Sequence, residues 1–145
     1  MYSIIIMTVI LAKREINSPI DKIWNIISNV DKDPEYWHGT RSIKNIKKEG
    51  NTIEREVIIS FKNYKCKEIV SLYNKNKITI EMVEGPLIGR KTITLEKLDE
   101  NITRINVVWD IHMKGLLNIF TIFVKKHILK GTVDAIARIA KNVED

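Results

Sequence analysis

The sequence has 145 residues with 44% hydrophobic and 29% charged residues, which fits one folded domain spanning residues 1–145 and excludes a disordered or fibrous chain. The single cysteine, Cys66, excludes an internal disulfide and a cysteine-based zinc site. The formal net charge of +6 comes mainly from scattered lysines, which are typical of a solvated surface, so we expect no nucleic-acid partner.

The chain starts with an apolar run at residues 4–11, whose eight residues are too few for a membrane span of about 20. No Lys or Arg precedes the run and no small-residue cleavage site follows it, so a signal peptide is not indicated. The run therefore favours a strand over residues 8–16. Without an indicated membrane span or signal peptide, we expect a cytoplasmic location. Met7 is an alternative start to Met1.

Two short helices are predicted next. Ser18 is expected to cap the first helix and Pro19 to occupy its first turn. Apolar residues at helical spacing continue this helix to about Asn29. Residues 31–37 predict a second short helix or turn.

After Gly39 the apolar residues recur with period 2, which is typical of β-strands. The predicted strands are 41–48, 52–61, 64–73, 77–84, 89–98 and 102–113. Because each is separated from the next by a short turn signal, they predict an antiparallel meander.

The last segment, residues 115–143, predicts one long helix that is one-sided from residue 125 onward. Its first turns, residues 116–124, form an apolar collar on all sides. The collar is either covered by the short helices and the loop at Gly85, or it is a pocket mouth, a homodimer contact or a membrane contact. Lys125 and Lys126 would extend such a membrane-surface contact to residues 116–126.

The order of these elements predicts an α+β helix-grip fold. A curved antiparallel sheet of about seven strands surrounds the long C-terminal helix, and two short helices follow the first strand. Since one helix does not fill a large curved sheet, this arrangement predicts a cavity between them.

Three segments carry a resemblance to a known group of proteins. They are Ile16–Trp24, Asn29–Trp37 and Glu84-Gly85-Pro86, followed by the terminal helix. In this order they resemble the START/Bet v 1-like (SRPBCC) helix-grip superfamily, in particular its polyketide cyclase/dehydrase and coenzyme Q-binding branch. The resemblance implies a hydrophobic pocket, because members bind sterols, lipids, quinones, plant hormones or polyketides. It leaves the ligand open.

Arg55 shares a strand face with four apolar residues, which are Ile53, Val57, Ile59 and Phe61. With a tight turn at Lys62-Asn63, Val57 would lie opposite Glu68 and Arg55 diagonal to it. An inward Arg55 would be a polar anchor for a ligand carbonyl or carboxylate. The alternative is an ordinary ion pair at the sheet rim.

Two tryptophans are further candidates. Trp109 shares the inward face of the last strand and is either cavity wall or core, and Trp37 is either a lid or a hydrophobic plug. No catalytic residue, metal site or cofactor is expected. The predicted ligand-binding residues are Trp37, Arg55, Val57, Ile59, Glu68, Met82, Ile93, Val107, Trp109, Leu117, Phe120 and Val124.

The leading functional hypothesis is a non-enzymatic carrier of a hydrophobic small molecule such as a lipid, isoprenoid or quinone. The alternatives are a polyketide cyclase/dehydrase-like enzyme and a protein-interaction module with a reduced cavity.

Overall fold

The computed structural model describes residues 7–113 and 121–144. The elements are β1 (Thr8–Ile16), α1 (Ile20–Ile27), the 3-10 helix η1 (Val30–Lys32), α2 (Asp33–Tyr36), β2 (Thr40–Glu49), β3 (Thr52–Ile59), β4 (Lys65–Tyr73), β5 (Lys77–Glu84), β6 (Leu87–Asp99), β7 (Ile102–Met113) and α3 (Thr121–Val143).

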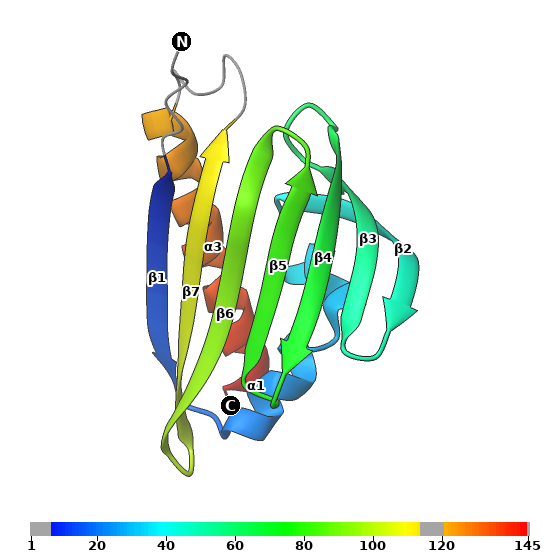
Figure 1. The fold of residues 1–145 in the computed structure, drawn as a ribbon. Helices are drawn as coiled ribbons and strands as arrows, with labels where there is room; N and C mark the ends of the chain where they lie inside the picture. Colours follow the sequence, from blue (N-terminus) through cyan, green and yellow to red (C-terminus); the bar gives the residue numbers. More distant parts are fainter. Residues whose placement is uncertain (1–6, 114–120, 145) are drawn as a thin grey trace.

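The seven strands form one antiparallel sheet in the order β1-β7-β6-β5-β4-β3-β2. Strands β2 to β7 follow one another as a meander, and β1 closes the sheet against β7. The sheet curves around α3, and the short helices lie near one end (Figure 1). The predicted helix-grip fold is confirmed, and the predicted strand boundaries differ from the observed ones by at most two residues.

The core lies between the concave face of the sheet and two helices. Alternate residues of each strand point inward because successive side chains of a strand point to opposite faces. They pack against α1 and the C-terminal half of α3, whose buried residues are Ile23, Ile27, Ala135, Ile136, Ile139, Ala140 and Val143. This packing fills only part of the space inside the sheet.

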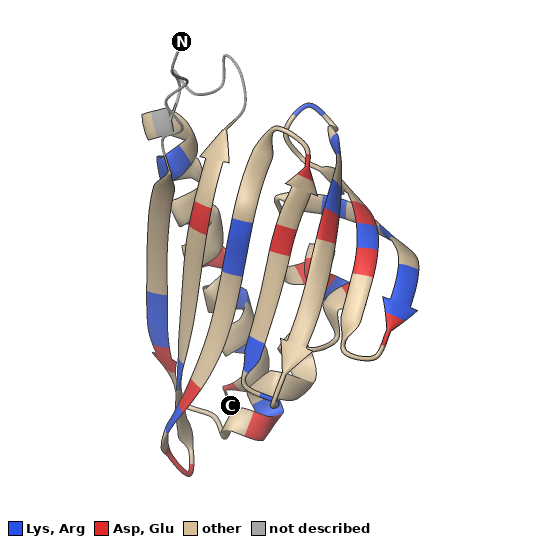
Figure 2. Ribbon diagram, viewed as in Figure 1, with Lys and Arg blue, Asp and Glu red and all other residues tan. Residues whose placement is uncertain are grey.

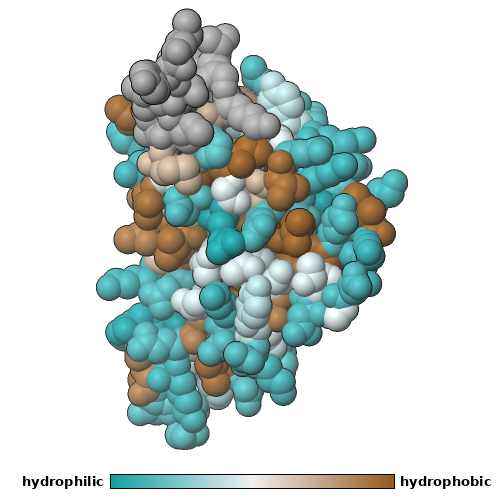
Figure 3. Space-filling model, viewed as in Figure 1, coloured by the Kyte–Doolittle hydropathy of each residue, from teal (hydrophilic) through white to brown (hydrophobic). Residues whose placement is uncertain are grey.

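The convex face carries a row of opposite charges across neighbouring strands. Arg90 on β6 lies between Asp110 on β7 and Glu81 on β5, and it forms an ion pair with Glu81 (Figure 2). In the space-filling view of this side, hydrophilic side chains are mixed with separate apolar areas (Figure 3). Val9 and Leu11 of β1 are among the exposed apolar residues.

The two outer strands of the sheet differ. The register of β2 with β3 shifts twice, between Thr40 and Ser42 and between Asn45 and Lys47. Most side chains of β2 are exposed. β1, at the opposite edge, pairs with β7 without such a shift and also contacts α3.

The predicted cap of the first helix is wrong. Pro19, not Ser18, occupies the N-cap position of α1, and no side chain caps the helix. Ser18 is instead buried, and its carbonyl oxygen accepts a hydrogen bond of 2.8 Å from the Thr103 hydroxyl. This bond ties the start of α1 to β7.

Gly89 lets β6 approach β7 closely. Its φ is +140°, and a Cβ atom at this position would lie 2.1 Å from the carbonyl oxygen of Asp110. Only glycine fits there, because both the conformation and the backbone contact exclude a side chain. Gly89 precedes the inward-facing Lys91 by two residues.

Of the predicted C-terminal helix, residues 115–120 lie outside the described residues, as does most of the collar. The described part of the chain contains no helix with the length and apolar character needed to cross a membrane.

Candidate ligand-binding site

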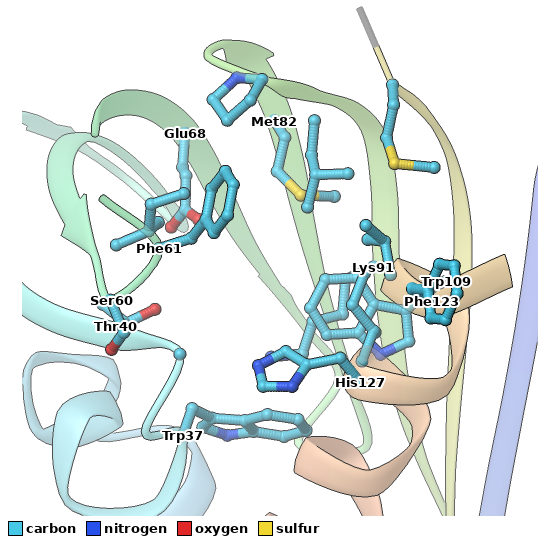
Figure 4. A pocket seen from close by; sticks show the side chains of 17 residues that line it. Trp37, Thr40, Ser60, Phe61, Glu68, Met82, Lys91, Trp109, Phe123 and His127 are labelled. Carbon is cyan, nitrogen blue, oxygen red and sulfur yellow. The ribbon is translucent and has the colours of Figure 1, made fainter. Parts of the chain in front are cut away.

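A cavity of about 490 Å³ lies between the concave face of the sheet, the first turns of α3 and the end of α2 (Figure 4). Its wall is mostly apolar. The lining residues are Trp37, Gly39, Thr40, Ile59, Ser60, Phe61, Glu68, Met82, Pro86, Leu87, Lys91, Trp109, Met113, Phe123, Val124, His127 and Ile128. Volumes of this size hold drug-sized or lipid-like molecules.

Lys91 is the most unusual residue of this wall. Its side chain is 6% exposed, and its Nζ atom lies 3.1 Å from the centroid of the Trp37 ring and 4.8 Å from that of Trp109. The two rings meet edge to face, with centroids 6.5 Å apart. A protonated Lys91 is therefore held by the negative faces of two aromatic rings.

Burial dominates the protonation of Lys91. Loss of water lowers the pKa of its amine to about 7, although the nearby carboxylates of Asp33 and Glu68 favour the charged form. The structure shows no hydrogen bond or ion pair to Nζ from the described residues. Lys91 is thus an amine that can exist in either protonation state near neutral pH.

A buried group of three charges lies beside the cavity. Arg55 donates from Nε to Oε1 of Glu68 at 3.0 Å and from Nη2 to Oδ2 of Asp33 at 2.8 Å. Its Nη1 donates to the carbonyl oxygen of Val30 at 3.1 Å. We call Asp33, Arg55 and Glu68 the charge triad. It joins β3 and β4 to the start of α2.

The charge triad corrects the predicted role and register of Arg55. Arg55 is 1% exposed, as an inward residue should be, but its donors serve the protein and it does not line the cavity. It lies directly opposite Glu68, and Val57 lies opposite Cys66, instead of the predicted diagonal arrangement. The turn after β3 is longer than two residues, because β3 ends at Ile59 and β4 begins only at Lys65, and Ile59 N–H donates to the carbonyl oxygen of Tyr64.

Asp33 and Lys91 are two functional residues that the sequence-based predictions did not include. Burial raises the pKa of the Asp33 carboxyl group, while the charges of Arg55 and Lys91 act in the opposite direction. Asp33 belongs to a four-residue helix, in which no periodic pattern marks an inward side chain. Lys91 did carry a signal, since it alternates with the buried Ile93 and Leu95 of the same strand.

Trp109 serves both roles that the sequence left open. Its ring lines the cavity, and its Nε1 donates a 2.9 Å hydrogen bond to the Thr132 hydroxyl of α3. That hydroxyl in turn donates to the carbonyl oxygen of Ile128 at 2.7 Å. The two bonds fix one cavity wall against the helix.

The predicted ligand-binding residues fall into three groups. The cavity is lined by Trp37, Ile59, Glu68, Met82, Trp109 and Val124. Arg55, Val57, Ile93 and Val107 are buried outside its lining, because Ile93 and Val107 pack into the helix-covered core and Val57 lies beside the charge triad. Leu117 and Phe120 lie outside the described residues.

The mouth of the cavity is formed by apolar side chains from two loops and α3. Phe61, 47% exposed, belongs to the turn after β3 and not to the strand as predicted. Pro86 and Leu87 come from the β5–β6 turn region, and Phe123 of α3 is 73% exposed. These four residues give the opening an apolar rim.

The polar groups of the cavity suit proton transfer and anion or carbonyl recognition. Lys91 and Glu68 reach the cavity from different strands, and Trp37 lies below Lys91 in the close view (Figure 4). An amine that changes charge near neutral pH, together with a carboxyl group, can donate and accept protons. The described residues contain no group of three or more His, Cys, Asp or Glu placed to hold a metal ion.

Several solved structures share this fold. ZhuI aromatase/cyclase from Streptomyces sp. R1128 is 10% identical, with a TM-score of 0.84 over 95% of this chain and 94% of its own. A START superfamily protein from Mycobacterium smegmatis is 16% identical, with a TM-score of 0.71 over 94% and 97% of the two chains.

Norcoclaurine synthase from Thalictrum flavum, solved as a point mutant with a transition-state analogue, is 18% identical, with a TM-score of 0.72 over 99% and 100%. No protein-family model matches the sequence, and no curated protein matches it. At these identities the likenesses establish the fold.

Proposed function

We propose that this protein, whose fold is the helix-grip fold of the START/Bet v 1-like superfamily, binds a hydrophobic small molecule between its sheet and α3. The observation that carries the proposal is the cavity of about 490 Å³ with an apolar wall and an apolar rim. Binding would transfer the apolar surface of the ligand from water to the apolar wall, which is favourable by about 25 cal/mol for each Å² of apolar surface buried.

Lys91 restricts the chemistry of the ligand. A buried amine without a hydrogen-bond partner among the described residues is costly, and a ligand oxygen would supply one. A ligand with an apolar body and one carboxylate, phenolate or carbonyl group meets both requirements. Lipids, isoprenoids and quinones remain the proposed classes.

A bulky residue at the cavity wall should block this ligand. We expect Val124→Trp to weaken the affinity for the fluorescent anion 1-anilinonaphthalene-8-sulfonate at least about tenfold. Val124 lines the cavity, so the indole ring would occupy its volume. The measurement is a fluorescence titration, together with native mass spectrometry of any molecule that copurifies with the unmodified protein.

Leu129→Trp is the matched control, because Leu129 is exposed on the same helix and does not line the cavity. Its affinity should equal that of the unmodified protein. Equal affinity of both variants would show that the dye binds elsewhere, and a bare protein mass together with weak dye binding would contradict the proposal.

The second candidate function is an enzyme of the cyclase/dehydrase kind. It is supported by Lys91 and Glu68, which place a base and an acid in one cavity. The third hypothesis, an interaction module with a reduced cavity, fits the observed volume poorly. The coenzyme Q-binding branch and the cytoplasmic location stay predictions.

We also propose that the mouth contacts an anionic membrane surface when the ligand enters or leaves. Phe123 of the rim and its neighbour Ile122 are exposed, and the exposed Lys125 and Lys126 follow them. Apolar side chains beside lysines suit the boundary between lipid headgroups and acyl chains.

We expect Phe123→Asp to reduce cosedimentation with phosphatidylserine-containing vesicles at least about fivefold, since a carboxylate opposes both forces. Leu129→Asp makes the same change of charge away from the rim and should bind as the unmodified protein does. Vesicle binding that survives Phe123→Asp would overturn the membrane contact. If the mass of the unmodified protein instead doubles as its concentration rises, a homodimer contact through these residues would be favoured.

A further inference from the structure

We propose that Lys91 binds its ligand covalently, by forming an imine with an aldehyde or ketone carbonyl of an apolar molecule. The inference rests on the proposed function and goes beyond it, because it assigns a reaction to a residue of the cavity wall. It starts from the position of the amine, which lies in the cavity between two tryptophan rings.

The first requirement of imine formation is an unprotonated amine that nothing else occupies. Nζ of Lys91 has no hydrogen bond or ion pair from the described residues, whereas the cationic head group of Arg55 nearby is fully engaged. The amine therefore faces the cavity with its lone pair available whenever it is uncharged. Its lowered pKa, about 7, makes the uncharged form common at neutral pH.

The second requirement is a place for the positive charge of the product. The neutral amine attacks the carbonyl carbon, and a carbon–nitrogen bond forms as the carbonyl π bond opens. The proton of the nitrogen passes to the oxygen to give a carbinolamine. Protonation of its hydroxyl group then releases water, and the iminium ion that remains carries its charge where Trp37 and Trp109 offer their ring faces.

The third requirement is a group that moves protons between these steps. Glu68 lines the same cavity and comes from the neighbouring part of the sheet, so its carboxylate can take the proton that the attacking nitrogen releases and give it to the hydroxyl group that leaves as water. Overall, one amine and one carbonyl give one imine and one water, and no oxidant or reductant is needed.

The titratable groups around Lys91 come from four elements. Asp33 of α2 and Glu68 of β4 favour the ammonium form, Arg55 of β3 opposes it, and His127 of α3 lines the cavity. Burial outweighs the net attraction of two carboxylates and one arginine, so the charged and uncharged forms of the amine are close in free energy near pH 7. Both forms are required, one for attack and one for the return of the proton.

The test uses 2-naphthaldehyde, an apolar aldehyde, with sodium cyanoborohydride at pH 7, which reduces an iminium ion to a stable amine. We expect one adduct per chain by intact mass, located at Lys91 by peptide mapping. Exposed lysines are uncharged in roughly one molecule of a few thousand at this pH, so labelling of Lys91 should be at least about 100-fold faster. The labelling rate should reach half its maximum near pH 7.

Lys91→Arg and Lys91→Met are the variants, with circular dichroism to verify folding. Both should lose the fast adduct, and the slow labelling of the other lysines should be unchanged. Adducts spread over many lysines without preference for Lys91 would overturn the proposal, as would equally fast single labelling in the variants.

The unreactive hydrocarbon 2-methylnaphthalene separates this proposal from the proposed function. If the hydrocarbon binds, and protects the cavity from the dye, while Lys91 stays unlabelled, the imine is wrong and the binding function stands. If neither the hydrocarbon nor the dye binds and Lys91 stays unlabelled, both are wrong.

Discussion

Replacing Arg55 by alanine is expected to lower the free energy of unfolding by about 3 to 5 kcal/mol, because the change strands buried charges. Asp33 and Glu68 each accept a hydrogen bond from the guanidinium group, and both would keep a carboxyl group with little access to water. Val30 would also lose the donor to its carbonyl oxygen. Urea unfolding followed by tryptophan fluorescence measures the loss.

Arg104→Ala is the matched control. Arg104 also pairs with two carboxylates, Glu15 and Glu96, but its side chain is 33% exposed and the pairs lie on the surface. Exposed pairs contribute about 0 to 1 kcal/mol, so this variant should lose no more than that. Equal losses of unfolding free energy in the two variants would show that the charge triad stabilises the fold no more than a surface ion pair does.

Comparison with the variant Lys91→Met is expected to show that the buried amine, when charged, lowers the free energy of unfolding by roughly 4 to 5 kcal/mol. This figure follows from the 1.36 kcal/mol that corresponds to each pKa unit. The pKa of Lys91 is about 7 in the folded chain and 10.5 as an ordinary lysine. Below pH 7 the amine is charged in both states, and folding must bury that charge. Between pH 7 and 10.5 only the unfolded chain binds the proton, so stability rises with pH and the penalty disappears.

The measurement compares the free energies of unfolding of the unmodified protein and Lys91→Met from pH 6 to 10. The variant should be the more stable at pH 6, and the difference should shrink steadily above pH 7. Asp33 and Glu68 are present in both proteins, so most of their own contributions cancel in the difference. Lys13→Met, at an exposed position of β1, should give a difference that does not change with pH, and a flat profile for Lys91→Met would contradict the buried amine.

The fold could be predicted from the sequence because its signals are local. Strands of alternating apolar residues end at short polar turns such as Asn74–Asn76 and Asp99–Asn101, and each turn joins neighbouring strands. The order of the elements placed the long helix inside the curved sheet, and the resemblance to helix-grip proteins implied the same fold. The prediction that failed, the cap of α1, also rested on a local signal. Serine is a common capping residue, but Ser18 is buried and its backbone is bound to Thr103 of β7, so its side chain does not cap the helix.

The site could be predicted only in part, because it depends on contacts between distant segments. Trp37, Glu68 and Trp109 stand out as an aromatic or charged side chain in an apolar pattern, and all three line the cavity. Whether Arg55 served a ligand or the protein depended on Asp33, which lies 22 residues away in a helix of four residues. The length of the turn after β3 also concealed the register, because residues 60–64 separate the two strands, whereas the sequence predicted a tight turn at Lys62 and Asn63.

The irregular outer strand β2 bears on how this protein behaves at high concentration. A regular edge strand presents unpaired backbone groups in a straight row, on which the strand of another molecule can align. The two register shifts of β2 interrupt that row, and the exposed Lys44, Lys47 and Lys48 add repulsion between like edges. These features make this edge of the sheet a poor template for the strand of another molecule.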